Sequence, residues 1–326
     1  MNMRNKMQAE RSAKEIFEQA TKYAFDYSDN VESRSVFPSE KAIEDLRLFD
    51  EDMPKINGDA SQILDQLHTF GSPASVAQTG GRYFGFVTGG ALPVALATKW
   101  LTDFWDQNSG LYLMSPISSM LERVTERWLR GLFGLPDHVG ASFLSGTSMA
   151  IFCGLAAARH RIYSNHGWDF NRQGHRGAPP IRIVAGSTSH GAVIKAVALI
   201  GFGLDHIEWV PSDKQGRLIT DELPALDNST IVLLQAGNVN TGSFDPIEQV
   251  CQLANEAGAW VHIDGAFGLW AGATSELKHL TSGMEKAQSW SVDGHKTLNT
   301  PYDNGILLCA DQEALVAALQ ASGSYL

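Results

Sequence analysis

The sequence WVHIDGAFG, residues 260–268, is a short apolar run that ends in a carboxylate followed by small residues. Alternation along an extended strand puts His262 and Asp264 on the same side, with Asp264 at the carboxyl end. Open α/β sheets bind ligands at that end. A buried carboxylate is costly without a partner, so we expect Asp264 either to meet a buried cation or to cap a turn.

Similar apolar runs lie on both sides of this stretch and alternate with helical patterns. Strands are expected at residues 181–184, 206–210, 231–234, 260–263, 289–292 and 306–309. Helices are expected at 148–159, 192–200, 221–226 and 246–257, with a surface excursion at 160–180. This alternation predicts an α/β fold with a mainly parallel sheet flanked by helices.

The start of the chain carries helical patterns without strand signals. Apolar spacing predicts helices at residues 8–28, 40–48 and 59–69, and the first has an apolar face that needs a partner surface. The Gly-rich stretch 80–90 is expected to form a structured loop. Ser115 and Pro116 predict the start of another helix, which Gly131 ends. We therefore expect an N-terminal helical segment, 1–80, and a large domain, 81–326.

Composition excludes several classes of protein. The chain of 326 residues has 25 Lys and Arg against 36 Asp and Glu, a net charge of −11, which argues against nucleic-acid binding. No apolar run reaches the ~18 residues of a membrane span, and the first residues lack the apolar core of a signal peptide. The three cysteines are widely spaced in apolar contexts, as buried thiols in a reducing compartment are. We expect a soluble, cytoplasmic protein without a nucleic-acid or membrane partner.

Three further stretches carry polar groups suited to chemistry. Glycine and hydroxyl residues stand at the start of a predicted helix, at Ser145 to Ser148. They either bind a phosphate group or only cap the helix. His190 lies between a strand and a helix, either as a cap or as a ring that stacks on a planar ligand. Lys296 directly follows a strand, either as an exposed loop lysine or as a desolvated amine able to form a Schiff base.

Together these groups meet the requirements of pyridoxal 5′-phosphate. Its phosphate favours a helix N-terminus, its aldehyde reacts with a lysine, and its pyridine nitrogen needs a carboxylate to keep the ring protonated. No metal site is expected. A nicotinamide-binding enzyme also fits the α/β pattern, but no Gly-x-Gly-x-x-Gly follows a strand.

The chain resembles the pyridoxal-dependent group II amino-acid decarboxylases, whose large domain has the aspartate-aminotransferase fold, type I. The resemblance runs from about residue 40 to the C-terminus. Its most specific stretches are HIDGAFG (262–268) and SWSVDGHKTLNTPYDNG (289–305). The supporting stretches are GRYFGFVTGG (81–90), SPISSMLE (115–122), SGTS (145–148), SHGAVIKA (189–196) and GNVNTGSFDP (237–246).

This resemblance implies a role for individual residues. Lys296 is implied to attach the cofactor covalently, Asp264 to pair with the pyridine nitrogen, and His190 to stack on the ring. Ala266 is implied to pack on the opposite ring face. The phosphate is implied to be held by Thr147, Ser148 and His295.

The sequence also departs from the family pattern. Thr147-Ser148-Met149-Ala150-Ile151 replaces Gly-Thr-Glu-Ala-Asn, and Gly237-Asn238-Val239 replaces Gly-Thr-Thr, so that Asn238 is left as the substitute donor to the cofactor. Family members continue for over a hundred residues beyond the lysine, whereas this chain ends at Leu326. The C-terminal small domain is therefore expected to be absent.

The resemblance implies decarboxylation of an L-amino acid to an amine and CO2, in a homodimer. The aromatic residues Tyr83, Phe84, Phe86 and Trp105 favour an aromatic substrate. Transamination, lyase chemistry and oxidative deamination to an aldehyde are alternatives in the same site. A truncated, catalytically incomplete protein that binds the cofactor is another.

Overall fold

The computed structural model describes residues 2–55 and 58–321 and contains two compact units, Met1–Gly90 and Ala91–Leu326. The last residues of the chain, 322–326, lie outside the described part. No helix in the described ranges is both long enough and apolar enough to cross a membrane.

The first unit is helical, as predicted. Its helices are α1 (Met3–Ser12), α2 (Glu15–Asn30), α3 (Glu40–Asp45) and α4 (Ala60–Gln66). The helix expected at 8–28 is divided into α1 and α2 at Ala13 and Lys14. Tyr23 of α2 stacks on His68, just beyond α4, with ring centroids 4.0 Å apart. The stretch 80–90 contains neither helix nor strand, which confirms the expected loop.

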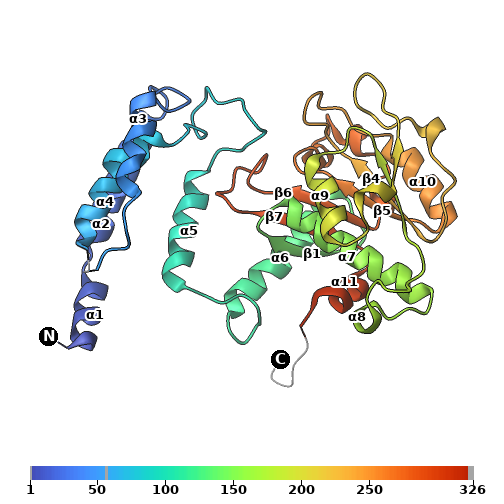
Figure 1. Cartoon of the computed structure of the whole chain (residues 1–326), viewed down its shortest axis with the longest axis horizontal. Helices are drawn as coiled ribbons and strands as arrows, with labels where there is room; N and C mark the ends of the chain where they lie inside the picture. The colour runs from blue at the N-terminus through green and yellow to red at the C-terminus, as the bar shows by residue number, and fades with distance from the viewer. Residues whose placement is uncertain (1, 56–57, 322–326) are drawn as a thin grey trace. The chain divides into compact units, whose positions relative to one another are not determined.

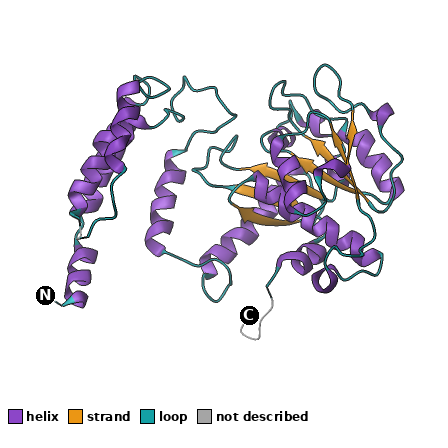
Figure 2. Ribbon diagram, in the orientation of Figure 1, coloured by secondary structure: helices purple, strands orange, loops and turns teal. Residues whose placement is uncertain are grey.

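The second unit is built on seven strands in the order β1-β7-β6-β5-β4-β2-β3 (Figures 1 and 2). The strands are β1 (Gly140–Leu144), β2 (Arg182–Gly186), β3 (Ile207–Val210), β4 (Thr230–Gln235), β5 (Trp260–Asp264), β6 (Ser289–Asp293) and β7 (Gly305–Cys309). Within these seven, β7 runs antiparallel to both of its neighbours. A mainly parallel sheet is therefore confirmed, with β1 as an additional strand that the sequence analysis did not predict.

Helices cover both faces of this sheet (Figure 2). The helices of this unit are α5 (Pro93–Trp105), α6 (Pro116–Phe133), α7 (Thr147–Asn165), α8 (Phe170–Gln173), α9 (Gly191–Leu199), α10 (Ile247–Ala257) and α11 (Gln312–Leu319). Helix α5 buries none of its residues and is not among those that cover the sheet. The expected helix at 221–226 is wrong: Thr220–Glu222 form one 3-10 turn. Helix α6 runs past Gly131 and ends at Gly134, whose φ of +67° suits a glycine C-cap.

The strands bury both of their faces, which explains their nearly continuous apolar sequences. In β4, Ile231 and Leu233 join the core under α7 and α9, whereas Val232 and Leu234 join the core under α6 and α10. Trp260 belongs to the α7 side. By alternation, His262 and Asp264 of β5 also face α7.

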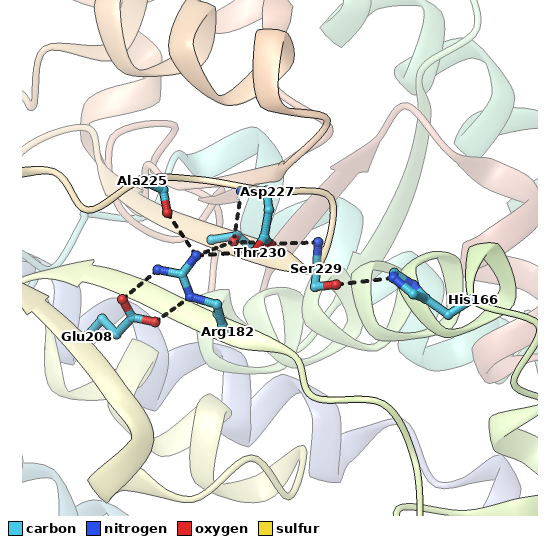
Figure 3. Close-up of polar contacts among 7 residues, drawn as sticks. All are labelled: His166, Arg182, Glu208, Ala225, Asp227, Ser229 and Thr230. Carbon is cyan, nitrogen blue, oxygen red and sulfur yellow. Dashed lines mark hydrogen bonds and ion pairs between the residues drawn. The ribbon is translucent and has the colours of Figure 1, made fainter.

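A polar cluster links β2, β3 and the segment before β4 at the edge of the sheet where the parallel strands begin (Figure 3). The guanidinium of Arg182 in β2 donates two parallel hydrogen bonds of 2.7 Å to Glu208 in β3. It also donates to the carbonyl of Ala225 at 2.8 Å, and it lies 3.4 Å from Asp227. The Ser229 hydroxyl lies 3.2 Å from His166 at the end of α7.

We expect Arg182→Ala to lower the free energy of unfolding by about 2 kcal/mol, because it breaks a bidentate pair and frees a carbonyl. Arg217→Ala is the matched control: Arg217 pairs with Asp213 on the exposed surface, where ion pairs contribute about 0.5 kcal/mol. Urea unfolding of both variants measures the difference. Equal losses would contradict a structural role of the Arg182 cluster.

Candidate functional site

The parallel strands β1, β2, β4, β5 and β6 end at one edge of the sheet, and the predicted site residues lie at or just beyond their ends. Asp264, the last residue of β5, is 5% exposed, and one of its oxygens accepts the amide N–H of Ala266 at 3.2 Å. Burial raises the pKa of Asp264, and the positive charge of Lys296 opposes that rise. The carboxylate is therefore stabilised by a cation at this position.

The end of β6 places Lys296 at the same edge. Its Nζ lies 3.1 Å from Oδ2 of Asp293, and its side chain keeps 21% exposure. His295 is buried, and its Nδ1 accepts the amide N–H of Asn304 at 2.9 Å. A neutral His295 thus carries its proton on Nε2, which lies 3.5 Å from Asp293. The ring stacks on Tyr302 at a centroid distance of 4.2 Å, which fixes its orientation.

The N-terminus of α7 completes this edge. A Cβ at Gly305 would lie 2.3 Å from Cα of Gly146, so the turn before α7 is pressed against the start of β7. The hydroxyl of Thr147 is buried and has no hydrogen-bond partner in the described part of the chain. Ser148 is exposed. An unpaired buried hydroxyl at a helix N-terminus is suited to a phosphate oxygen.

His190 is the N-cap of α9, and its Nδ1 accepts the N–H of Ala192 at 3.2 Å. This bond places the proton of the neutral ring on Nε2. The imidazole is exposed and within electrostatic range of Asp264. The ring is therefore available to a planar ligand that reaches Asp264.

Asn238 lies in the turn after β4, where its side chain serves mainly to build that turn. Its amide oxygen accepts the N–H groups of Asn240 and Thr241. The amide nitrogen lies 3.5 Å from the Thr188 hydroxyl. Because the oxygen is engaged in the turn, a contact from Asn238 to the cofactor has to come from the amide nitrogen.

Asp293 lies at the same edge of the sheet, although no role was predicted for it from the sequence. It is 3% exposed, and its Oδ1 accepts the N–H of Thr147 at 2.7 Å. The signal was present in the sequence, because Asp293 ends the strand next to β5 just as Asp264 ends β5 itself. A carboxylate three residues before Lys296 was a natural partner for its amine.

A second buried polar group lies on the same face of β5. The indole N–H of Trp260 donates to the Ser289 hydroxyl at 2.9 Å, and that hydroxyl lies 2.8 Å from Nδ1 of His262. The Ser289 oxygen accepts from Trp260, and its single proton can be donated to His262 only if Nδ1 carries no proton. Burial lowers the pKa of His262 to about 3, so the ring stays neutral.

This depressed pKa makes stability fall in acid. The unfolded chain binds a proton at His262 below its usual pKa of about 6.5, whereas the folded chain resists protonation until about pH 3. Between pH 6.5 and pH 5, His262 should therefore remove about 2 kcal/mol from the free energy of unfolding. We expect His262→Asn to lose less stability over this interval, and exposed His279→Asn to match the original chain. Unfolding titrations at the two pH values measure this, and an equal acid loss in all three proteins would contradict it.

Comparison with known proteins shows what this chain is similar to. Residues 43–326 match the pyridoxal-dependent decarboxylase conserved domain. Cysteine sulfinic acid decarboxylase from Mus musculus is 27% identical over 296 residues, which cover 88% of this chain and 59% of the relative. The chain thus spans about three fifths of the length of that relative.

Solved structures share the fold. The crystal structure of mouse CSAD superposes with a TM-score of 0.86 at 22% identity, covering 96% of this chain and 66% of that one. Oryza sativa TDC with PLP and tryptamine gives a TM-score of 0.84 at 24% identity, covering 97% and 67%. The second unit therefore has the type I fold of pyridoxal-phosphate enzymes.

Proposed function

The chain belongs to the pyridoxal-dependent decarboxylase family, and we propose that it removes the carboxylate of an L-amino acid as CO2 and leaves the amine. One observation carries the proposal: Lys296, buried Asp264 and the N-terminus of α7 meet at the carboxyl edge of the sheet. These three groups suit the aldehyde, the pyridine nitrogen and the phosphate of one cofactor, respectively.

The residues fit pyridoxal phosphate by their chemistry. When bound, the cofactor supplies a ring that accepts the electron pair left by the departing CO2. Lys296 would hold the cofactor and exchange with the substrate amine, and Asp264 would keep a proton on the pyridine nitrogen. The unpaired hydroxyl of Thr147, together with Ser148 and His295, would hold the phosphate.

The remaining predicted residues would position the ring. His190 would cover one face, since its imidazole is exposed beside Asp264. Ala266 would pack on the other face, because a small side chain permits close approach. Asn238 would donate from its amide nitrogen.

For the substrate we propose an aromatic amino acid. Trp105, the last residue of α5 in the second unit, is 47% exposed, and its indole offers a surface on which an aromatic ring can stack. TDC with bound tryptamine shares the fold. Cysteine sulfinic acid, named for the mouse relative, is the competing substrate.

A product assay tests both proposals. Purified protein with pyridoxal phosphate is incubated with tryptophan, tyrosine, phenylalanine and cysteine sulfinic acid. We expect equal amounts of CO2 and amine from an aromatic substrate. Keto acid or aldehyde in place of amine would show transamination or oxidative deamination, and turnover of cysteine sulfinic acid alone would contradict the aromatic preference.

We also propose that the working form is a homodimer. Large apolar side chains lie exposed on α5, α6 and the segment between them, namely Val94, Leu101, Leu113, Met120 and Trp128. Exposed apolar surface of this extent is typical of protein interfaces. Size-exclusion chromatography at micromolar concentration should give a dimer, and a monomer would count against it.

A further inference from the structure

Asp293 is a buried carboxylate that contacts two of the elements expected to hold the cofactor. Its Oδ1 accepts the Thr147 N–H at 2.7 Å, and its Oδ2 lies 3.1 Å from Nζ of Lys296. The same oxygen lies 3.5 Å from Nε2 of His295. One negative charge therefore contacts the helix N-terminus and both basic residues after β6.

The backbone holds Asp293 in this position from both sides. Its amide N–H donates to the carbonyl of Ala266 at 2.9 Å, and its carbonyl accepts the indole N–H of Trp270 at 3.0 Å. Because both backbone groups are anchored and the side chain is short, the carboxylate has little freedom to leave the end of α7.

Asp293 is also the anion that complements the dipole of α7. This helix has 19 residues, carries no acidic residue in its first turn and has Gly146 as its N-cap, which provides no capping side chain. The free N–H groups and dipole of a helix N-terminus attract one negative group strongly. The unpaired buried hydroxyl of Thr147 lies at the same position, ready for a further oxygen.

We propose that Asp293 sets the affinity of this chain for phosphate-bearing ligands, by competing with the phosphate for the Thr147 amide and for the Nε2 of His295. This inference rests on the proposed function, because it assigns the N-terminus of α7 to the cofactor's phosphate. The carboxylate weakens phosphate binding in two ways: it holds the amide, and it repels a second anion across a buried site.

The test compares Asp293→Asn with Asp311→Asn. Asp311 is a matched control, because it also caps a helix, accepting the N–H of Ala314 at 2.9 Å, and also pairs with a cation, Arg161. It follows β7 at the opposite edge of the sheet. Equilibrium dialysis gives the dissociation constants for pyridoxal phosphate and for pyridoxal, which has no phosphate.

We expect Asp293→Asn to bind pyridoxal phosphate at least tenfold more tightly than the original chain, with a clearly smaller gain for pyridoxal. Asp311→Asn should match the original chain. If Asp293→Asn does not fold, Asp293→Ser removes the same charge and should change affinity in the same direction. Unchanged or weaker binding of pyridoxal phosphate by the folded variant would overturn the inference.

Inorganic phosphate separates this inference from the proposed function. Phosphate should raise the melting temperature of Asp293→Asn more than that of the original chain. If no protein binds pyridoxal phosphate but this difference is present, the proposed function fails and the role of Asp293 stands. If phosphate has the same effect on both proteins, the role of Asp293 is overturned.

Discussion

Lys296→Ala is expected to abolish covalent attachment of pyridoxal phosphate and to lower turnover by at least about a thousandfold, because the protein loses both its nucleophile and its proton-transfer group. Lys296 follows β6 directly, and its amine reaches the edge of the sheet where Asp264 and the α7 N-terminus lie. The visible absorbance of the bound cofactor should disappear with the amine. Absorbance spectra and product formation measure the two effects separately.

Two further variants make this result specific. Lys296→Arg keeps a positive charge beside buried Asp293 but cannot form the Schiff base, so it should fold and still lose covalent attachment. Lys286→Ala removes a lysine that pairs with Glu248, before the start of β6, and should keep full absorbance and turnover. A cofactor band that persists in Lys296→Ala would mean that another residue carries the cofactor.

Asp264→Asn should leave the cofactor attached and yet remove most of the activity. The amide has nearly the shape of the carboxylate but no charge to hold the pyridine proton. Losing one partner of a buried ion pair costs about 4 kcal/mol, which corresponds to roughly a thousandfold in turnover. Burial raises the pKa of Asp264, so its charge depends on a cation close by.

The measurement separates attachment from catalysis. Asp264→Asn should retain the visible absorbance that Lys296→Ala loses, with kcat reduced and the amine still the product. Asp264→Glu keeps the charge and should recover part of the activity. Normal turnover by Asp264→Asn would contradict the role of this carboxylate.

The sequence predicted the centre of the fold well because buried parallel strands leave a simple signal. Residues Ile231 to Leu234 are apolar on both faces, and Trp260 to Ile263 are apolar except for His262; each stretch lies within a strand of the structure. β1 was missed because its pairing with β7 is antiparallel and most of its residues are only partly buried. Such a strand depends on a partner far away in the chain.

The helices show where local patterns fail. Residues 221–226 have helical spacing but only a single 3-10 turn, since Leu223, the next residue, is extended. Helix α5 was not predicted, although its polar residues Thr98, Lys99, Thr102 and Asp103 share one face of the helix; none of its residues is buried in this chain. In residues 221–226 the tertiary structure overrode the local helical pattern. In α5 the helix forms without a buried face in this chain.

The candidate site could be predicted because parallel strands bring distant residues to one edge. Asp264 and Lys296 are 32 positions apart in the sequence and follow adjacent strands. Asp293 was overlooked because its importance depends on the amide of Thr147, almost 150 residues earlier in the chain. The role of the Asn238 side chain in its turn was not predicted either, because its oxygen accepts the N–H groups of Asn240 and Thr241, two local contacts with no distinctive sequence pattern.

The central claim is that Lys296 carries pyridoxal phosphate in a site that includes Asp264. The most direct test is to incubate the purified chain with the cofactor, reduce it with borohydride, digest it and map the modified peptide by mass spectrometry. We expect the phosphopyridoxyl group on Lys296, in the peptide that contains the sequence DGHK. Modification of a different lysine, or of many lysines equally, would contradict the claim.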